Sequence, residues 1–146
     1  MFTLLVTLHV LFAVFVIGPL AVIPHLSLRF ARNRQADQVR SIATLTTVFS
    51  WASVIVFVLG FGALSFDTES GVGFGQLWVW LSIVLYLAAF ALAFFVVVPS
   101  MKTAATEIEA NPEGTGKPTG YGALTATAGV VSVLLLAIVV LMALRP

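Results

Sequence analysis

The stretch FTLLVTLHVLFAVFVIGPLAVIPHL, from Phe2 to Leu26, decides the fold of this chain. A helix needs about 20 predominantly apolar residues to cross the hydrocarbon core of a bilayer, and this stretch is long enough to do so. Three more stretches of the same kind follow it, at Ile42–Phe66, Leu77–Pro99 and Ala123–Leu144. The sequence therefore predicts an all-α fold, an integral membrane four-helix bundle.

The composition agrees with a membrane location. Of the 146 residues, 60% are hydrophobic and 9% are charged, and the mean hydropathy is +1.12, whereas soluble domains carry about 25% charged residues. Four spans leave only short connections, so we expect residues 1–146 to form a single domain. The absence of cysteine excludes disulfides, iron–sulfur clusters and thiolate metal sites. A net charge of +1 gives no reason to expect nucleic acid as a partner.

The distribution of basic residues predicts the orientation in the membrane. Six of the seven follow the first or the third span: Arg29, Arg32, Arg34, Arg40, Lys102 and Lys117. The seventh, Arg145, lies at the opposite side. Basic loops are retained on the cytoplasmic side during insertion, so both termini are expected outside in a multi-pass protein of the cell membrane.

Prolines interrupt two of the spans. Gly18-Pro19 and Pro24 lie near the end of the first span, and Pro99 follows Val98 in the third. Because proline removes a backbone donor and clashes with the preceding turn, we expect a kink or break in the first span near the cytoplasmic boundary and the end of the third span at Pro99. The break is interpreted as a bend at the membrane interface, with a functional hinge as the alternative.

Small and hydroxylated residues recur at helical spacing in the second and fourth spans. Such residues let membrane helices approach closely and form hydrogen bonds between them. We therefore expect helix packing, with a substrate path as the alternative, at Thr46, Ser50, Ser53, Gly60, Thr125, Gly129 and Ser132. Trp78 and Trp80 are typical of an aromatic belt at the outer boundary, whereas Trp51 lies deeper and is expected to pack within the bundle.

His9 is the one Asp, Glu, Lys, Arg or His residue well inside a span. An ionisable residue at this depth is a functional candidate, and the alternative is a neutral imidazole bonded to a nearby hydroxyl or carbonyl. Tyr86 reaches a comparable depth from the same side and is the best internal partner for His9. His25 follows Pro24 and is expected at the cytoplasmic boundary.

The two histidines cannot clasp one haem within a single chain, because sixteen residues of helix separate them by about 24 Å. A single axial ligand from His9 remains open, and so does copper, although Met1, Met101 and Met142 form no cluster in the sequence. Proton-coupled transport is disfavoured because every carboxylate lies in a loop.

The segment LVTLHVLFAVFVIGP, Leu5–Pro19, resembles the opening of a family of small bacterial four-span proteins that are predicted integral membrane proteins of unknown function. A histidine followed by a glycine and a basic loop is also similar to the opening of the copper-resistance D-type and J-type protoporphyrinogen oxidase membrane families. In those families the histidine is associated with metal or haem, which implies such a role for His9. The oxidase pattern has a lysine inside the third helix, whereas Lys102 lies beyond Pro99 here.

Two hypotheses of function follow. The first is a non-catalytic accessory subunit or assembly factor of a larger membrane complex, because the chain has few interior polar groups and no catalytic motif. Residue usage rich in alanine, valine and leucine resembles that of actinobacterial proteins, whose respiratory assemblies include such subunits. The second is a haem- or metal-binding bundle with His9 as ligand and Tyr86 or Ser53 as support. From the residues alone we expect no catalytic residue and no cofactor. Under the second hypothesis the cofactor would be haem.

Overall fold

The computed structural model describes residues 1–69 and 71–144 and consists of helices joined by short connections. The elements are α1 (Phe2–Arg32), α2 (Ala36–Ser65), α3 (Leu77–Leu92), the π-helical turn η1 (Ala93–Val97), α4 (Val98–Ala110) and α5 (Tyr121–Leu144). Because α3, η1 and α4 follow one another without interruption, they form one rod, and four helices in all are long and apolar enough to cross a membrane. The predicted all-α four-helix bundle in a membrane is thereby confirmed. Arg145 lies outside the described residues.

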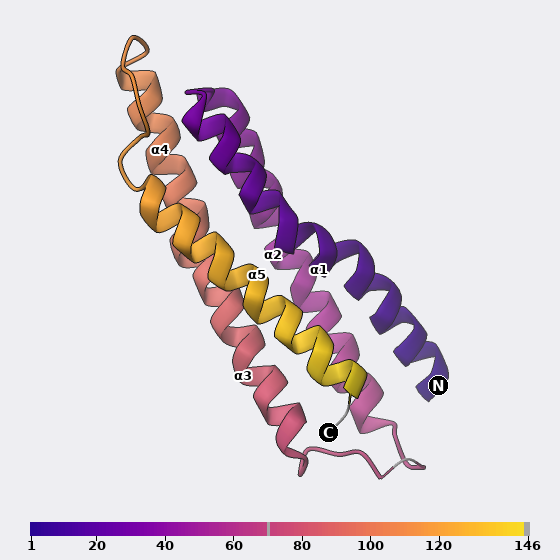
Figure 1. The fold of residues 1–146 in the computed structure, drawn as a ribbon. Helices are drawn as coiled ribbons and strands as arrows, with labels where there is room; N and C mark the ends of the chain where they lie inside the picture. The colour runs from indigo at the N-terminus through magenta and orange to yellow at the C-terminus, as the bar shows by residue number, and fades with distance from the viewer. Residues whose placement is uncertain (70, 145–146) are drawn as a thin grey trace.

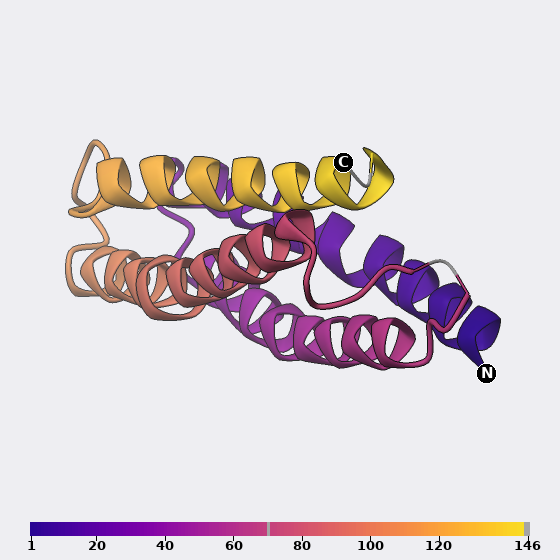
Figure 2. The same cartoon turned by 90° about the horizontal axis from the view of Figure 1, so that it is seen from below.

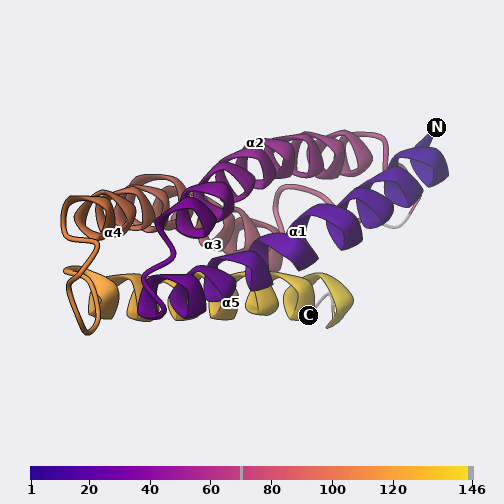
Figure 3. The same ribbon diagram turned by 90° about the horizontal axis from the view of Figure 1, so that it is seen from above.

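The four long helices alternate in direction (Figure 1). The start of α1, the α2–α3 connection and the end of α5 lie at one end of the bundle, which we call the terminal end. The α1–α2 turn and the α4–α5 loop (111–120) lie at the other, the polar end. Along the bundle α2 packs mainly against α1 and α4, and α3 packs mainly against α5, which also contacts α1. At the terminal end α1 diverges from α5, as the two views in Figures 2 and 3 agree.

The helices continue through the prolines at which a kink or break in the first span and the end of the third span were predicted. α1 runs on through Pro19 and Pro24 to Arg32 and changes direction along its length instead of breaking (Figure 1). Neighbouring helices and Ser/Thr side chains make prolines tolerable in membrane helices. Pro24 is fully buried, and the Ser27 hydroxyl donates to the Pro24 carbonyl at 2.5 Å.

The third span likewise does not end at Pro99. The helix instead adopts the π-helical turn η1 just before this proline, and the Val98 N–H donates to the Ala93 carbonyl five residues back. Such a turn is a common local adjustment of a helix near a proline or a packing constraint. The helix continues to Ala110, beyond the apolar stretch that ends at Pro99.

At the polar end α1 is terminated by a Schellman motif. The Gln35 N–H donates to the Phe30 carbonyl and the Arg34 N–H to the Ala31 carbonyl, while Arg34 takes the left-handed conformation with φ 56°. Glycine usually occupies this position. The Arg34 guanidinium explains the exception, because it donates to the Asn111 carbonyl at 2.8 Å and to the Gly116 carbonyl at 3.3 Å.

The other arginines of the basic segment lie at the same end. Arg40 pairs with Glu109 at 2.8 Å and thereby joins α2 to α4. This hydrogen bond from the Arg40 guanidinium lowers the pKa of Glu109 below its ordinary value. Arg29 and Arg32 are exposed in the last turn of α1, where cations interact favourably with the helix dipole. Which side of the membrane the polar end faces stays a prediction.

The residues predicted to pack between helices fall into two groups. Thr46, Ser50 and Ser53 are fully buried on one face of α2, and Ser132 bridges helices by donating to the Ala21 carbonyl of α1 at 2.6 Å. Thr125 is different, because its side chain is exposed and its hydroxyl bonds to the carbonyl one turn back within α5.

Gly129 also differs from the expectation of close packing, since a Cβ placed there meets no atom within 4 Å. Residues spaced along one stripe of a helix are not equally close to the neighbouring helix, because two helices cross at an angle. The spacing of Thr125, Gly129 and Ser132 in α5 therefore predicted more helix contact than the structure has. Of these three residues, Ser132 alone forms a hydrogen bond to another helix.

The tryptophans lie at two depths. The indoles of Trp78 and Trp80 donate to Gln76 Oε1 and to the Phe74 carbonyl, each at 2.6 Å, which places their polar edges at the terminal end. Trp51 makes edge-to-face contacts with Phe90 and Phe94. It was expected inside the bundle, yet 58% of it is exposed, so its indole faces outward from the α2–α3 seam.

Candidate functional site

A largely apolar cavity of about 740 Å³ occupies the terminal half of the bundle, between α1, α2, α3 and α5. The cavity exists because α1 packs mainly against α2 and α3 packs mainly against α5. The α1–α2 pair and the α3–α5 pair therefore separate toward the terminal end (Figure 2). Ligand pockets of roughly 300 to 1,000 Å³ are typical of proteins that bind small molecules or cofactors. The few polar side chains on its wall include His9, Ser82, Tyr86 and Ser132.

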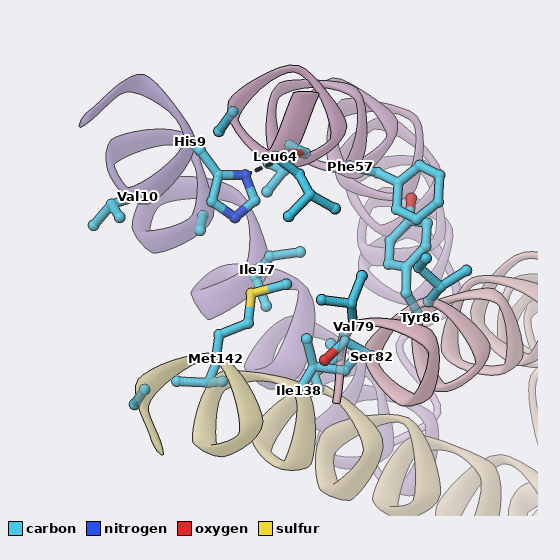
Figure 4. Close-up of a pocket in the computed structure, with 18 of the residues that line it drawn as sticks. His9, Val10, Ile17, Phe57, Leu64, Val79, Ser82, Tyr86, Ile138 and Met142 are labelled. Atoms are coloured by element: carbon cyan, nitrogen blue, oxygen red, sulfur yellow. Dashed lines mark hydrogen bonds between the residues drawn. The ribbon is translucent and has the colours of Figure 1, made fainter. Parts of the chain in front are cut away.

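His9 lies on the α1 wall of this cavity with a defined tautomer. Its Nδ1 lies 2.8 Å from the Val56 carbonyl of α2, and a carbonyl oxygen only accepts, so the proton is on Nδ1. In the neutral ring the lone pair is then on Nε2. Figure 4 shows that this second nitrogen points toward the interior of the cavity. A backbone carbonyl that fixes the tautomer in this way is typical of histidines that bind a metal through the other nitrogen.

Gly60 permits this position of the imidazole. A Cβ at Gly60 would lie 2.9 Å from His9 Cε1 and 3.2 Å from Nδ1, closer than an ordinary contact. The sequence singled out Gly60 for close packing of helix backbones, whereas the atoms that approach it are those of the His9 side chain. The absence of a side chain at residue 60 is therefore part of the site.

Tyr86 lines the same cavity but does not bond to His9. Its hydroxyl lies 2.9 Å from Ser53 Oγ, and the Ser53 hydroxyl itself donates to the Ser50 carbonyl at 2.6 Å. Tyr86 is therefore the donor in a short relay that runs from the cavity wall into α2. The Ser50 hydroxyl is fully buried and has no partner among the described residues.

An aromatic wall surrounds Tyr86. Its ring stacks on Phe57 at 4.6 Å between centroids, and Phe57 contacts Phe61 at 4.7 Å. All three side chains line the cavity. Aromatic side chains that line the same cavity as an imidazole suit a planar or conjugated ligand, because offset stacking adds to the burial of apolar area.

Met142 is a cavity residue that the sequence shows only as one of three dispersed methionines. It lies near the end of α5, 133 positions from His9 in the sequence, and its thioether points toward the His9 side of the cavity (Figure 4). The thioether sulfur is a soft ligand of the kind that binds haem iron or copper(I). No local pattern in the fourth span distinguishes this methionine from an ordinary apolar residue.

His25 takes a different position. Because the Ser132 hydroxyl donates to the Ala21 carbonyl, the bond of 2.8 Å between His25 Nε2 and Ser132 Oγ has the imidazole as donor. Ser132 lines the deep end of the cavity, and His25 itself is exposed beyond it. His25 therefore helps to hold α1 against α5 and does not share the wall that carries His9.

The donor set limits the kind of metal site. Within the described residues no group of three or more His, Cys, Asp or Glu side chains could hold a metal ion. A closed zinc or copper site of several histidines or carboxylates does not fit this pattern. A metal that carries most of its own ligands, as iron does in a porphyrin, needs only one or two protein ligands.

Comparison with known proteins gives a family. No curated protein and no solved structure matches the chain. The family described as "Predicted integral membrane protein (DUF2269)" matches residues 3–146, which include all four spans and the cavity. The chain therefore belongs to the DUF2269 family of predicted integral membrane proteins.

Proposed function

We propose that this protein is a ligand-binding membrane bundle whose cavity takes up haem or a similar metal-bearing ring, with His9 Nε2 as a ligand. The observation that carries this proposal is the bond from His9 Nδ1 to the Val56 carbonyl, which leaves the Nε2 lone pair directed into an apolar cavity of about 740 Å³. The opening of the chain, a histidine followed by a glycine and a basic loop, is similar to that of families that associate this histidine with metal or haem, and this similarity agrees with the proposal.

Met142 would be a second residue able to hold the iron, because its thioether faces the same cavity (Figure 4). The aromatic wall of Phe57, Phe61 and Tyr86 would support the ring, and Gly60 would hold the imidazole in place. Bound haem would supply a redox-active iron whose potential rises when methionine replaces a more basic axial ligand.

Haem titration of the purified chain tests this proposal. We expect a Soret band in the wild type, and we expect His9→Ala to weaken binding by at least about tenfold, because the iron–nitrogen bond is lost. His25→Ala is the matched control, since His25 is not on the cavity wall, and it should bind as the wild type does. Met142→Leu keeps the side-chain volume and should retain haem at a lower redox potential. Equal affinity of wild type and His9→Ala would disprove the role of His9.

A second candidate function is that of an accessory subunit or assembly factor in a larger membrane complex, for example a respiratory one. The observation that favours it is Trp51, which is 58% exposed near the middle of α2. Among the described residues its indole N–H has no acceptor, and lipid tails offer none. A neighbouring subunit would provide both an acceptor and apolar contacts.

Affinity purification in mild detergent separates the two candidates. Co-purification of a membrane complex that is lost in Trp51→Ala but kept in Trp80→Ala supports the subunit function, because Trp80 already donates to the Phe74 carbonyl. A pure chain with no companion protein argues against it, whether or not the chain binds haem.

We infer from the basic residues that the polar end faces the cytoplasm. The chain has no cysteine, so a single introduced cysteine reports on its own position. Glu69→Cys, in the α2–α3 connection, should react with a membrane-impermeant maleimide added to intact cells. Asn33→Cys, in the α1–α2 turn, should react only after the cells are opened. The reverse pattern would invert the orientation.

A further inference from the structure

The cavity is open on one side, and this side faces lipid. Several residues line the cavity and are also largely exposed on the bundle surface, among them Val10 and Val14 of α1 and Leu136 and Val139 of α5. Each of these is more than half exposed. They lie on the two helices that diverge toward the terminal end (Figure 3). A molecule dissolved in the bilayer can therefore reach the cavity between α1 and α5 without passing through water.

The cavity is also long. Its lining on α1 begins at Phe2 and continues to Ala21, a length of about 28 Å at 1.5 Å per residue. His9 lies in the part nearer the terminal end. Beyond His9 the cavity extends along α1 for about another 18 Å toward the polar end, where its wall is formed by Gly18, Ala21, Leu135 and the Ser132 hydroxyl.

Gly18 marks free space in this deeper part. It belongs to the cavity wall, and a Cβ built on it meets no atom within 4 Å. The glycine therefore is not required by a close approach of another helix, and because it is exposed it leaves the open side of the cavity free at this level. The deeper part contains no group that would bind a polar ligand besides the Ser132 hydroxyl, which already bonds to the Ala21 carbonyl.

We propose that the ligand of this cavity is a membrane-dissolved amphiphile that carries a long hydrocarbon tail, which enters between α1 and α5. Its ring or head lies at His9 and the aromatic wall, and its tail runs along α1 past Gly18 to Ala21 and Ser132. This inference rests on the proposed ligand-binding function and adds the chemical class and the source of the ligand. A flat ring without a tail would leave the deeper part of the cavity to lipid.

A fluorescent fatty acid, cis-parinaric acid, can test the tail site without any assumption about the head. Trp78 lines the cavity, so energy transfer from Trp78 to the probe reports binding once Trp51 and Trp80 are replaced by Phe. Gly18→Leu places a side chain in the deeper part. Because the displaced tail loses its van der Waals contacts with the wall, we expect the apparent Kd of the probe to rise by about tenfold.

Gly129→Leu is the matched control, because Gly129 is also a helical glycine with no atom within 4 Å of a built Cβ and is not on the cavity wall. It should leave the Kd of the probe unchanged. Ala21→Leu is a second blocking variant and should act as Gly18→Leu does. Circular dichroism and gel filtration of each variant verify that the bundle is folded.

The outcomes separate this inference from the proposed function. Equal probe binding by wild type, Gly18→Leu and Ala21→Leu would overturn the tail site, and so would an equal loss in Gly18→Leu and Gly129→Leu. His9→Ala should keep the probe and lose haem. If the wild type binds no haem while the probe responds to Gly18→Leu and not to Gly129→Leu, the haem proposal fails and the tail site stands.

Discussion

The contact between Gly60 and His9 gives a quantitative prediction for Gly60→Ala. An alanine Cβ would lie 2.9 Å from His9 Cε1, and ordinary contact begins at 3.4 Å, so the ring must move by about 0.5 Å or more. Val56 and Gly60 lie one turn apart on α2, and a ring pushed away from Gly60 also leaves the Val56 carbonyl. The bond of 2.8 Å then exceeds the usual limit of about 3.2 Å.

Two opposing effects decide the stability of this variant. Loss of the hydrogen bond costs about 0.5 to 1.5 kcal/mol, while replacing a helical glycine by alanine gains up to about 1 kcal/mol. We therefore expect almost no net change in wild type and a gain in the His9→Ala background, where the ring is absent. The coupling energy between the two positions should be about 1 kcal/mol.

Reversible unfolding in sodium dodecyl sulfate, followed by circular dichroism, measures this double-mutant cycle. Gly62→Ala is the control, because a Cβ there lies 3.7 Å from Leu5 Cδ1, an ordinary contact, and its effect should be the same in both backgrounds. A coupling energy below about 0.3 kcal/mol, which is within the usual additivity of distant sites, would refute the claim that residue 60 positions the imidazole. Gly60→Ala should also weaken haem binding, whereas Gly62→Ala should not.

Three further predictions concern the other polar contacts. Tyr86→Phe removes the donor to Ser53 and should destabilise the bundle by about 0.6 kcal/mol, typical of bonds between membrane helices; an unchanged unfolding curve would contradict the relay. Arg34→Ala and Arg34→Gly both lose the bonds to the α4–α5 loop, but only glycine adopts the left-handed backbone conformation without strain. In equilibrium unfolding, Arg34→Gly should therefore be more stable than Arg34→Ala by about 1 kcal/mol. Arg40 lowers the pKa of Glu109. Their pairing should therefore stabilise the polar end fully above the ordinary pKa of glutamate, and this stabilisation should be lost as the pH falls through the lowered pKa. If thermal denaturation of Glu109→Gln showed the same pH dependence as the wild type, the prediction would be wrong.

The spans could be predicted from the sequence because hydrophobic length alone determines which segments cross a bilayer. Their limits could not, since a kink or break was expected at Pro19 and Pro24 and the third span was expected to end at Pro99, whereas both helices continue. The continuation depends on contacts with other parts of the fold. Pro24 is fully buried against the neighbouring helices, and buried α4 residues such as Met101 keep the other helix packed beyond Pro99.

The candidate site was predictable only in part. His9 could be identified because an ionisable residue is rare inside a span, and Tyr86 because it lies at a similar depth. The contacts of His9 with Val56 and Gly60 could not be foreseen, since depth along a helix says nothing about which face of the next helix is nearest. Met142 could not be connected with His9 for the same reason, because three dispersed methionines give no signal until the fold places one of them on the same cavity wall as the imidazole.

The π-helical turn η1 has a consequence for comparison among members of the family. It holds one residue more than an α-helical turn needs, and each added residue rotates everything that follows by about 100°. Met101 and Ile108 therefore owe their inward orientation to this extra residue. A member whose third span is one residue shorter would reach the same packing with a straight helix, and an alignment would be correct only with its gap at 93–97, not in the loop at 111–120.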